Sequence, residues 1–152
     1  MKVVIFLGSE SDKEFVDGMD KEFKAWGVDA EFKVASAHKV PEKVFEFVVK
    51  CNESEEDLVY ITVAGRSNAL SGVIAANSIH PVIACPPFKD KDDYIVNIHS
   101  TLNMPSDTPV LTVIDRLNAI MSVLRIFALK NPELKKKMQE RISEMKSKFN
   151  LN

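Results

Sequence analysis

The amino-acid sequence predicts an α/β fold, a parallel sheet of about five strands with helices on both faces. Short apolar segments alternate along the chain with segments whose apolar residues recur at helical spacing. The first apolar segment, KVVIFL at 2–7, is apolar nearly throughout, as strands buried on both faces are. Alternating strands and helices form open parallel sheets through right-handed crossovers. The sequence therefore indicates a three-layer, flavodoxin- or Rossmann-like domain.

Four more segments carry the strand signal. The segment 57–64, DLVYITVA, gives the strongest signal, because β-branched and aromatic residues favour strands. The segment 29–35 gives the weakest. The segments 80–85 and 109–114 each contain a short apolar run beside a proline. Five strands are therefore expected.

Five segments are predicted to be helices: 12–26, 41–51, 70–78, 116–130 and 131–149. In the first, Phe15, Met19 and Phe23 lie four residues apart, and Gly27 suits a left-handed helix terminator. Pro41 suits the first position of the second helix, where no amide hydrogen is needed. The segment 86–109 is predicted to be a long connection punctuated by prolines.

The last predicted helix, over 131–149, could contribute to an interface between subunits. We expect residues 1–152 to form one domain with a helical extension over about 131–150, because no repeat, linker or change of composition divides the chain. An apolar stripe runs along this otherwise charged helix through Leu134, Met138, Ile142 and Met145. The stripe could pack on its own domain or on a neighbouring subunit, and the pattern alone favours neither.

Composition argues against several classes of partner. The formal net charge is −2, so no basic field would attract nucleic acid or an anionic membrane surface. Cys51 and Cys85 have no CxxC spacing and no neighbours typical of a metal site, so we expect reduced thiols and no metal. No apolar run is long enough to cross a bilayer, and the first is too short for a signal peptide. We therefore expect a cytoplasmic protein.

Three polar loops follow the first three predicted strands. In a parallel sheet the carboxyl ends of the strands lie at one edge, so these loops should meet there and form a ligand site. The first loop, GSESD at 8–12, could open a helix whose amides bind a phosphate, with the Asp12 carboxylate beside the hydroxyls of a ribose. The alternative is simple capping, with Ser11 and Glu14 as a capping box.

The second loop, SAHK at 36–39, brings an imidazole to this edge. Val40 precedes Pro41 and is biased toward an extended conformation, which keeps His38 and Lys39 on the loop. An isolated histidine is usually structural, but His38 is the one general-base candidate among the three loops. Lys39 could pair with an anion.

The third loop, AGRSNALSG at 64–72, is suited to an oxyanion. Its glycines allow close backbone approach, and Arg66, Ser67 and Asn68 supply hydrogen-bond donors. The alternative is a serine-rich helix start capped by Asn68 or Ser67. The sequence lacks dinucleotide and P-loop signatures, so a phosphorylated sugar or a mononucleotide is the favoured ligand.

These motifs, in this order, resemble the phosphoribosylaminoimidazole carboxylase (PurE) family of purine biosynthesis. The resemblance covers residues 2 to about 129 and includes IACPP at 83–87 and MPS at 104–106. One class of this family rearranges an N-carboxylated ribonucleotide. The other, class II, carboxylates 5-aminoimidazole ribonucleotide (AIR) directly with carbon dioxide to give 4-carboxy-AIR. Lysine after the SAH histidine and the loop AGRSNALSG are similar to class II.

The resemblance implies roles for individual residues. His38 matches the catalytic general acid and base, Asp12 the ribose-binding position, and Ser9, Ser11 and Lys39 phosphate-binding positions. The other implied substrate-binding residues are Gly8, Ser36, Ala37, Ala64, Gly65, Arg66, Ser67 and Leu70. Ala64 and Leu70 would border a small apolar niche for carbon dioxide. No cofactor is implied, and the expected assembly is a homo-oligomer, an octamer in this family.

Two other functions remain open. The first is the mutase reaction of the other class, which uses N5-carboxy-AIR and the same histidine. The second is a module that binds a sugar phosphate or mononucleotide without chemistry. The segment after Asp90 matches the family only loosely.

Overall fold

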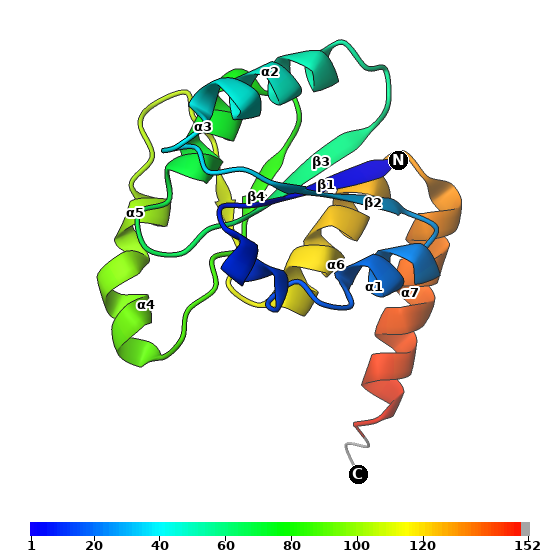
Figure 1. Ribbon diagram of the computed structural model, residues 1–152. Coiled ribbons are helices and arrows are strands. Elements are labelled where there is room, and N and C mark those ends of the chain that lie inside the picture. The colour runs from blue at the N-terminus through cyan, green and yellow to red at the C-terminus, as the bar shows by residue number, and fades with distance from the viewer. Residues whose placement is uncertain (150–152) are drawn as a thin grey trace.

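The chain folds around a parallel sheet with the strand order β2-β1-β3-β4-β5 (Figure 1). The computed structural model describes residues 1–149. Within them the strands are β1 (Lys2–Leu7), β2 (Asp29–Val34), β3 (Leu58–Val63), β4 (Val82–Ala84) and β5 (Leu111–Thr112). Each predicted strand segment contains one of these strands. This flavodoxin-like order confirms the predicted fold class.

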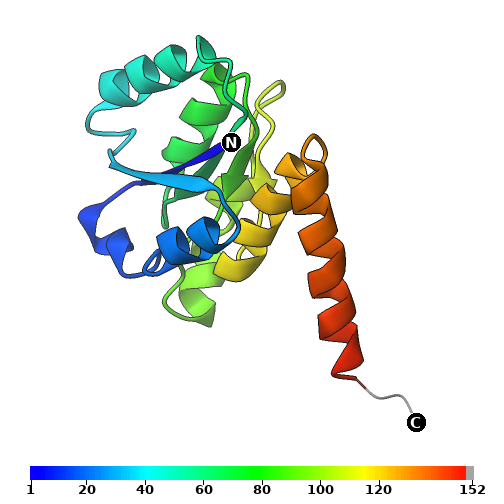
Figure 2. The same ribbon diagram turned by 90° about the vertical axis from the view of Figure 1, so that its right-hand side faces the viewer.

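Helices cover both faces of the sheet. They are the short 3-10 helix η1 (Glu10–Lys13) and the α-helices α1 (Met19–Ala25), α2 (Pro41–Asn52), α3 (Ala69–Asn77), α4 (Lys91–Asn97), α5 (His99–Leu102), α6 (Arg116–Phe127) and α7 (Pro132–Ser147). Figures 1 and 2 show α2 and α3 on one face and α1, α6 and α7 on the other, with α4 and α5 beside the sheet. Among residues 1–149 there is no helix with the length and apolarity needed to span a membrane.

Strand β1 shows why the sequence KVVIFL is apolar almost throughout. It lies between β2 and β3, and its side chains alternate between two cores. Ile5 packs with residues of α1, α6 and α7, whereas Phe6 packs with residues of α2 and α3. Both side chains are at most 2% exposed. A strand with helices on both faces must be apolar on both faces.

The predicted helix over 12–26 is wrong in its first half. The structure has η1, then a turn, and an α-helix only from Met19. Gly18 adopts a left-handed backbone conformation with φ of 78° and precedes the first turn of α1. A continuous helix cannot pass through such a residue. Gly27, also left-handed at 76°, terminates α1 as predicted.

The connection 86–109 contains α4 and α5, which the sequence pattern did not indicate. Helix α4 begins at an Asp90 cap, whose carboxylate accepts a hydrogen bond from the Asp93 amide at 2.8 Å. Both helices are short, and α4 has no buried residue while α5 has only Thr101. Neither therefore carries the apolar stripe from which a helix is predicted.

The stripe on α7 divides into a covered part and an exposed part. Leu134 and Met138 are buried in the core of the same chain, and the Arg141 guanidinium lies over the Trp26 ring. Met145 is 53% exposed, on the part of α7 that extends beyond the body of the molecule (Figure 2). The first half therefore packs on its own chain. The predicted extension ended at residue 150, which lies outside the described residues.

Candidate active site

The three predicted loops line one cavity of about 870 Å³ at the carboxyl edge of the sheet. It is lined by every predicted site residue except Lys39, namely Gly8, Ser9, Ser11, Asp12, Ser36, Ala37, His38, Ala64, Gly65, Arg66, Ser67 and Leu70. These residues come from segments up to about sixty positions apart in the sequence, and the parallel topology places them together.

The first loop is a tight turn held by Ser9. The Ser9 hydroxyl oxygen accepts hydrogen bonds from the Ser11 amide at 3.3 Å and the Ser11 hydroxyl at 3.0 Å. Ser9, not Ser11, is therefore the cap, and the predicted Ser11–Glu14 capping box is wrong. Burial raises the pKa of the Asp12 carboxyl above its ordinary value, and a hydrogen bond with the Ser9 backbone partly opposes this rise.

Little space is left for a side chain at Gly8 and Gly65, where the loops after β1, β3 and β4 lie close together. A Cβ atom on Gly8 would lie 3.2 Å from the Ala64 Cβ, and one on Gly65 would lie 3.1 Å from the Pro87 carbonyl oxygen. Both distances are shorter than ordinary van der Waals contacts. The two glycines therefore let the loop backbones approach one another at the base of the site.

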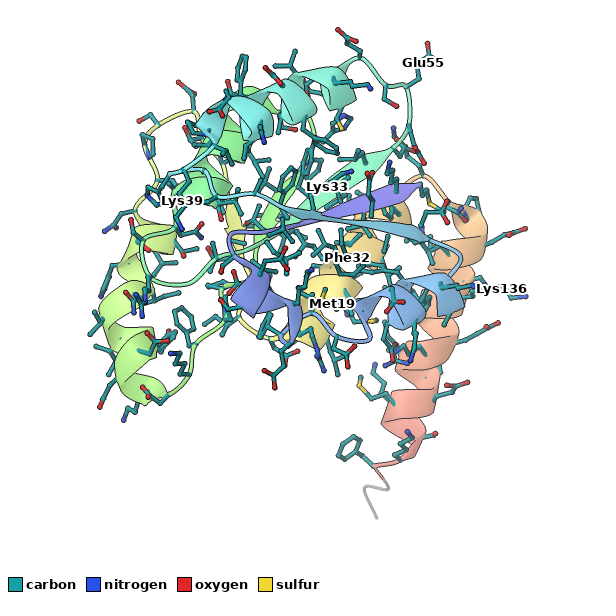
Figure 3. The ribbon with its side chains drawn as sticks, viewed as in Figure 1. Met19, Phe32, Lys33, Lys39, Glu55 and Lys136 are labelled. Atoms are coloured by element: carbon teal, nitrogen blue, oxygen red, sulfur yellow. The ribbon has the colours of Figure 1, made fainter. Side chains whose placement is uncertain are left out.

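The second loop presents His38 at the cavity in an exposed position. Its turn is closed by hydrogen bonds from the amides of Lys39 and Val40 to the Ser36 carbonyl, at 3.1 and 2.9 Å. The imidazole is thus accessible to a ligand and not enclosed in the core. Lys39 is also exposed but does not line the cavity, and it lies near the start of α2 (Figure 3).

The third loop both caps a helix and lines the cavity. The Asn68 side-chain oxygen accepts a hydrogen bond from the Ser71 amide at 3.1 Å and so caps α3, as the capping alternative predicted. Arg66 and Ser67, just before this cap, line the cavity. Arg66 has a φ of 48°, a left-handed conformation that is uncommon outside glycine.

A fourth loop, which follows β4, completes the lining. It contributes Pro87, Phe88 and Lys89; Asp93 of α4 and, just after η1, Glu14 and Phe15 also line the cavity. The sequence analysis did not predict these residues as part of the site. The rule that located the first three loops also applies to β4, because its carboxyl end lies at the same edge.

The lining is suited to an anionic, partly apolar ligand. Arg66 and Lys89 supply positive charge at the third loop and after β4, the carboxylates of Asp12, Glu14 and Asp93 also line the cavity, and the serine hydroxyls and loop amides supply hydrogen bonds. Ala64 and Leu70 add an apolar surface, at 8% and 2% exposure. Residues 1–149 contain no group of three or more His, Cys, Asp or Glu side chains that could hold a metal ion.

Sheet order and cavity together define a flavodoxin-like α/β protein with a candidate ligand cavity at the carboxyl edge of its sheet. The family model described as AIR carboxylase matches residues 2–148. The chain therefore belongs to the AIR carboxylase family, a family of enzymes of purine biosynthesis, as the motifs predicted.

Relatives within this family carry two different names. The chain is 44% identical to a phosphoribosylaminoimidazole carboxylase of Archaeoglobus fulgidus over 138 residues, covering 91% of this chain and 75% of the relative. It is 40% identical to an N5-carboxyaminoimidazole ribonucleotide mutase of Methanocaldococcus jannaschii over 148 residues, covering 96% of this chain and 91% of the relative.

The fold matches a solved structure of the same family. The crystal structure of Treponema denticola PurE superposes with a TM-score of 0.88 at 33% sequence identity, over 97% of this chain and 92% of that chain. Similarity of sequence and fold thus establishes the family, and the two names of the relatives leave two activities to distinguish.

Proposed function

We propose that this protein carboxylates AIR with carbon dioxide to give 4-carboxy-AIR, with His38 as general acid and base. The observation that carries this proposal is the single cavity in which an accessible imidazole, the Arg66 and Ser67 donors and the polar first loop lie together. Lys39 after His38 and the loop AGRSNALSG favour direct carboxylation over the mutase reaction, because both are similar to class II of the family.

The chemistry needs little more than the groups that line the cavity. The amino group of AIR makes its imidazole ring electron-rich, so a ring carbon can attack carbon dioxide and form the new carbon–carbon bond. That carbon then carries both a hydrogen and a carboxylate. His38 removes the proton, and the electron pair of the broken C–H bond restores the aromatic ring.

The third loop would stabilise the carboxylate. Negative charge develops on the oxygen atoms of carbon dioxide as the bond forms, and Arg66 and Ser67 offer a guanidinium and hydrogen-bond donors. Ala64 and Leu70 would keep carbon dioxide beside the ring carbon, because an apolar niche suits a neutral, nonpolar molecule.

The first loop would hold the ribose phosphate. In this proposal the hydroxyls of Ser9 and Ser11 bind the phosphate, and Asp12 accepts hydrogen bonds from the ribose hydroxyls. Lys39 belongs to the proposal as a phosphate partner that approaches from outside the cavity lining. Lys89 is a second candidate, since it lines the cavity.

Assembly and location are part of the same proposal. We expect a single-domain homo-oligomer, an octamer as in the family, located in the cytoplasm. The part of the α7 stripe that its own chain leaves uncovered, where Met145 is 53% exposed, supports contact with another subunit.

The second candidate is the N5-carboxy-AIR mutase reaction, favoured by the name of the Methanocaldococcus jannaschii relative at 40% identity. An isotope experiment separates the two. Purified protein is offered AIR with ¹³C-bicarbonate or, separately, unlabelled N5-carboxy-AIR with ¹³C-bicarbonate, and the carboxyl label of the product is measured.

Direct carboxylation predicts turnover of AIR into labelled 4-carboxy-AIR. A product formed from N5-carboxy-AIR that keeps its unlabelled carboxyl group, with no turnover of AIR, would instead establish the mutase. Ligand binding without turnover of either substrate would identify a binding module.

A further inference from the structure

Helix α5 lies outside the four loops that line the cavity, yet its side chains hold the third loop. Figure 1 shows α5 next to α3, the helix that this loop begins. Ser100 and Thr101, in the middle of α5, both form hydrogen bonds to residues of the loop. Neither residue lines the cavity.

Ser100 connects the two peptide groups that flank Ser67. Its hydroxyl donates a hydrogen bond to the Arg66 carbonyl at 2.5 Å and accepts one from the Asn68 amide at 3.1 Å. The Asn97 carbonyl, 2.9 Å away, is the other possible acceptor for the same proton. The proton can go to only one of these two carbonyls at a time, and when it goes to Arg66 the hydroxyl bridges the loop on both sides of Ser67.

This bridge acts where the backbone is strained. A left-handed conformation costs a non-glycine residue about 1 kcal/mol, so surrounding contacts must hold Arg66 at its φ of 48°. The Ser100 hydroxyl is bonded to the carbonyl of Arg66 itself. It therefore stabilises the turn from which the guanidinium extends.

A buried second anchor fixes α5 against the loop. The Asn68 side-chain amide donates to the Thr101 hydroxyl at 3.0 Å, and these residues are 4% and 2% exposed. The Asn68 oxygen also accepts from the Ser71 hydroxyl at 2.9 Å, and Ser71 is hydrogen-bonded to Thr62 of β3 at 2.6 Å. Hydrogen bonds thus run from the central sheet through the loop to α5.

We propose that Ser100 is a positioning residue, whose hydroxyl fixes the left-handed turn at Arg66 and thereby aims the Arg66 and Ser67 donors at the substrate carboxylate. This inference rests on the proposed function, because it assigns the third loop to that carboxylate. It assigns Ser100 no direct contact with substrate.

The test compares Ser100→Ala and Ser100→Thr with the control Ser122→Ala. Ser122 of α6 donates to the carbonyl of Asn118 in its own helix at 2.8 Å, so the control removes a serine hydroxyl and its hydrogen bond without touching the loop. Steady-state kinetics with AIR and with N5-carboxy-AIR are combined with thermal unfolding and with crystal structures of wild type and Ser100→Ala.

We expect Ser100→Ala to lower kcat by about 10- to 100-fold, because small displacements of positioned groups have effects of this size. KM should change by less than about threefold, Ser100→Thr should recover most of kcat, and Ser122→Ala should match wild type. The crystal structure of Ser100→Ala should show Arg66 outside the left-handed region.

Either of two kinetic results would overturn the inference: a kcat of Ser100→Ala close to that of wild type, or a Ser100→Thr variant no better than Ser100→Ala. If the wild type turns over neither substrate, the proposed function fails, whereas the Arg66 conformation in the variant crystal still decides whether Ser100 holds the turn. An unchanged Arg66 φ there would also overturn the inference.

Discussion

The loops after β2 and β3 both line the cavity, but they are held in different ways. The loop after β3 is anchored by buried side chains of Asn68 and Thr101 and by the Ser100 hydroxyl. The loop after β2 is closed by backbone hydrogen bonds to the Ser36 carbonyl, and His38 is exposed on it. The loop after β3, named the rigid loop here, is therefore held by side chains of a second element, whereas the loop after β2, named the open loop, is held by its own backbone. Arg66, Ser67 and His38 are all exposed.

This difference matches the two tasks that we propose for the loops. Donors that stabilise developing charge are most effective when they are already in place, because no free energy is then spent on orienting them during the reaction. A general base must instead reach a proton on the bound substrate, so it needs access. The rigid loop holds Arg66 and Ser67, and the open loop carries the exposed imidazole of His38.

The largest effect is expected at the strained residue of the rigid loop. Arg66→Gly removes the guanidinium and also the steric cost of a left-handed backbone. We expect kcat to fall by about 100-fold or more, as for the loss of an oxyanion donor. The free energy of unfolding should be higher by about 1 kcal/mol than that of Arg66→Ala, because alanine keeps a Cβ atom in the left-handed conformation.

The matched control is therefore Arg66→Ala, studied by the same kinetic assay and by denaturant unfolding. Equal losses of activity with different stabilities would separate the chemical role of Arg66 from its backbone strain. A glycine variant that is less stable than the alanine variant would contradict the left-handed turn.

A smaller effect is expected on the open loop. Lys39→Ala should weaken binding of AIR by about tenfold, because a charge-assisted contact with phosphate is lost. Measured by calorimetry from low to high salt, the affinity of the variant should also depend less on ionic strength than that of wild type.

Lys136→Ala is the control for general charge, because Lys136 extends from α7 far from the cavity (Figure 3). Lys89→Ala, measured in the same way, shows which of the two lysines binds the phosphate, since Lys89 lines the cavity and Lys39 does not. Equal affinities of wild type and Lys39→Ala for AIR would show that Lys39 does not bind the phosphate.

Much of the fold could be predicted because its signals are local. The apolar segment at β1 and the proline that begins α2 need no knowledge of distant residues. The break at Gly18 was missed because Phe15, Met19 and Phe23 keep a helical spacing across it, and that spacing outweighed the glycine in the prediction. The short helices α4 and α5 carry no apolar stripe to reveal them.

Those site residues whose positions follow from the topology of the sheet could be predicted from the sequence. One rule, that the carboxyl ends of parallel strands meet, is enough to predict that His38, Asp12 and Arg66 lie at one edge of the sheet. The same rule would have added Lys89 had it been applied to β4. Ser100 lies 34 positions from Arg66 in the sequence, and only the packing of α5 brings the two together.

In the proposed reaction the His38 imidazole on the open loop removes the proton of a bound ribonucleotide, and His38→Asn tests this role. Asparagine keeps a polar side chain of moderate size but cannot act as a base near neutral pH. The measurement pairs AIR affinity by calorimetry with the rate of ¹³C incorporation from bicarbonate. The account predicts an affinity within about threefold of wild type and a rate at least about 100-fold lower. A variant that binds AIR and carboxylates it at the wild-type rate would contradict the account.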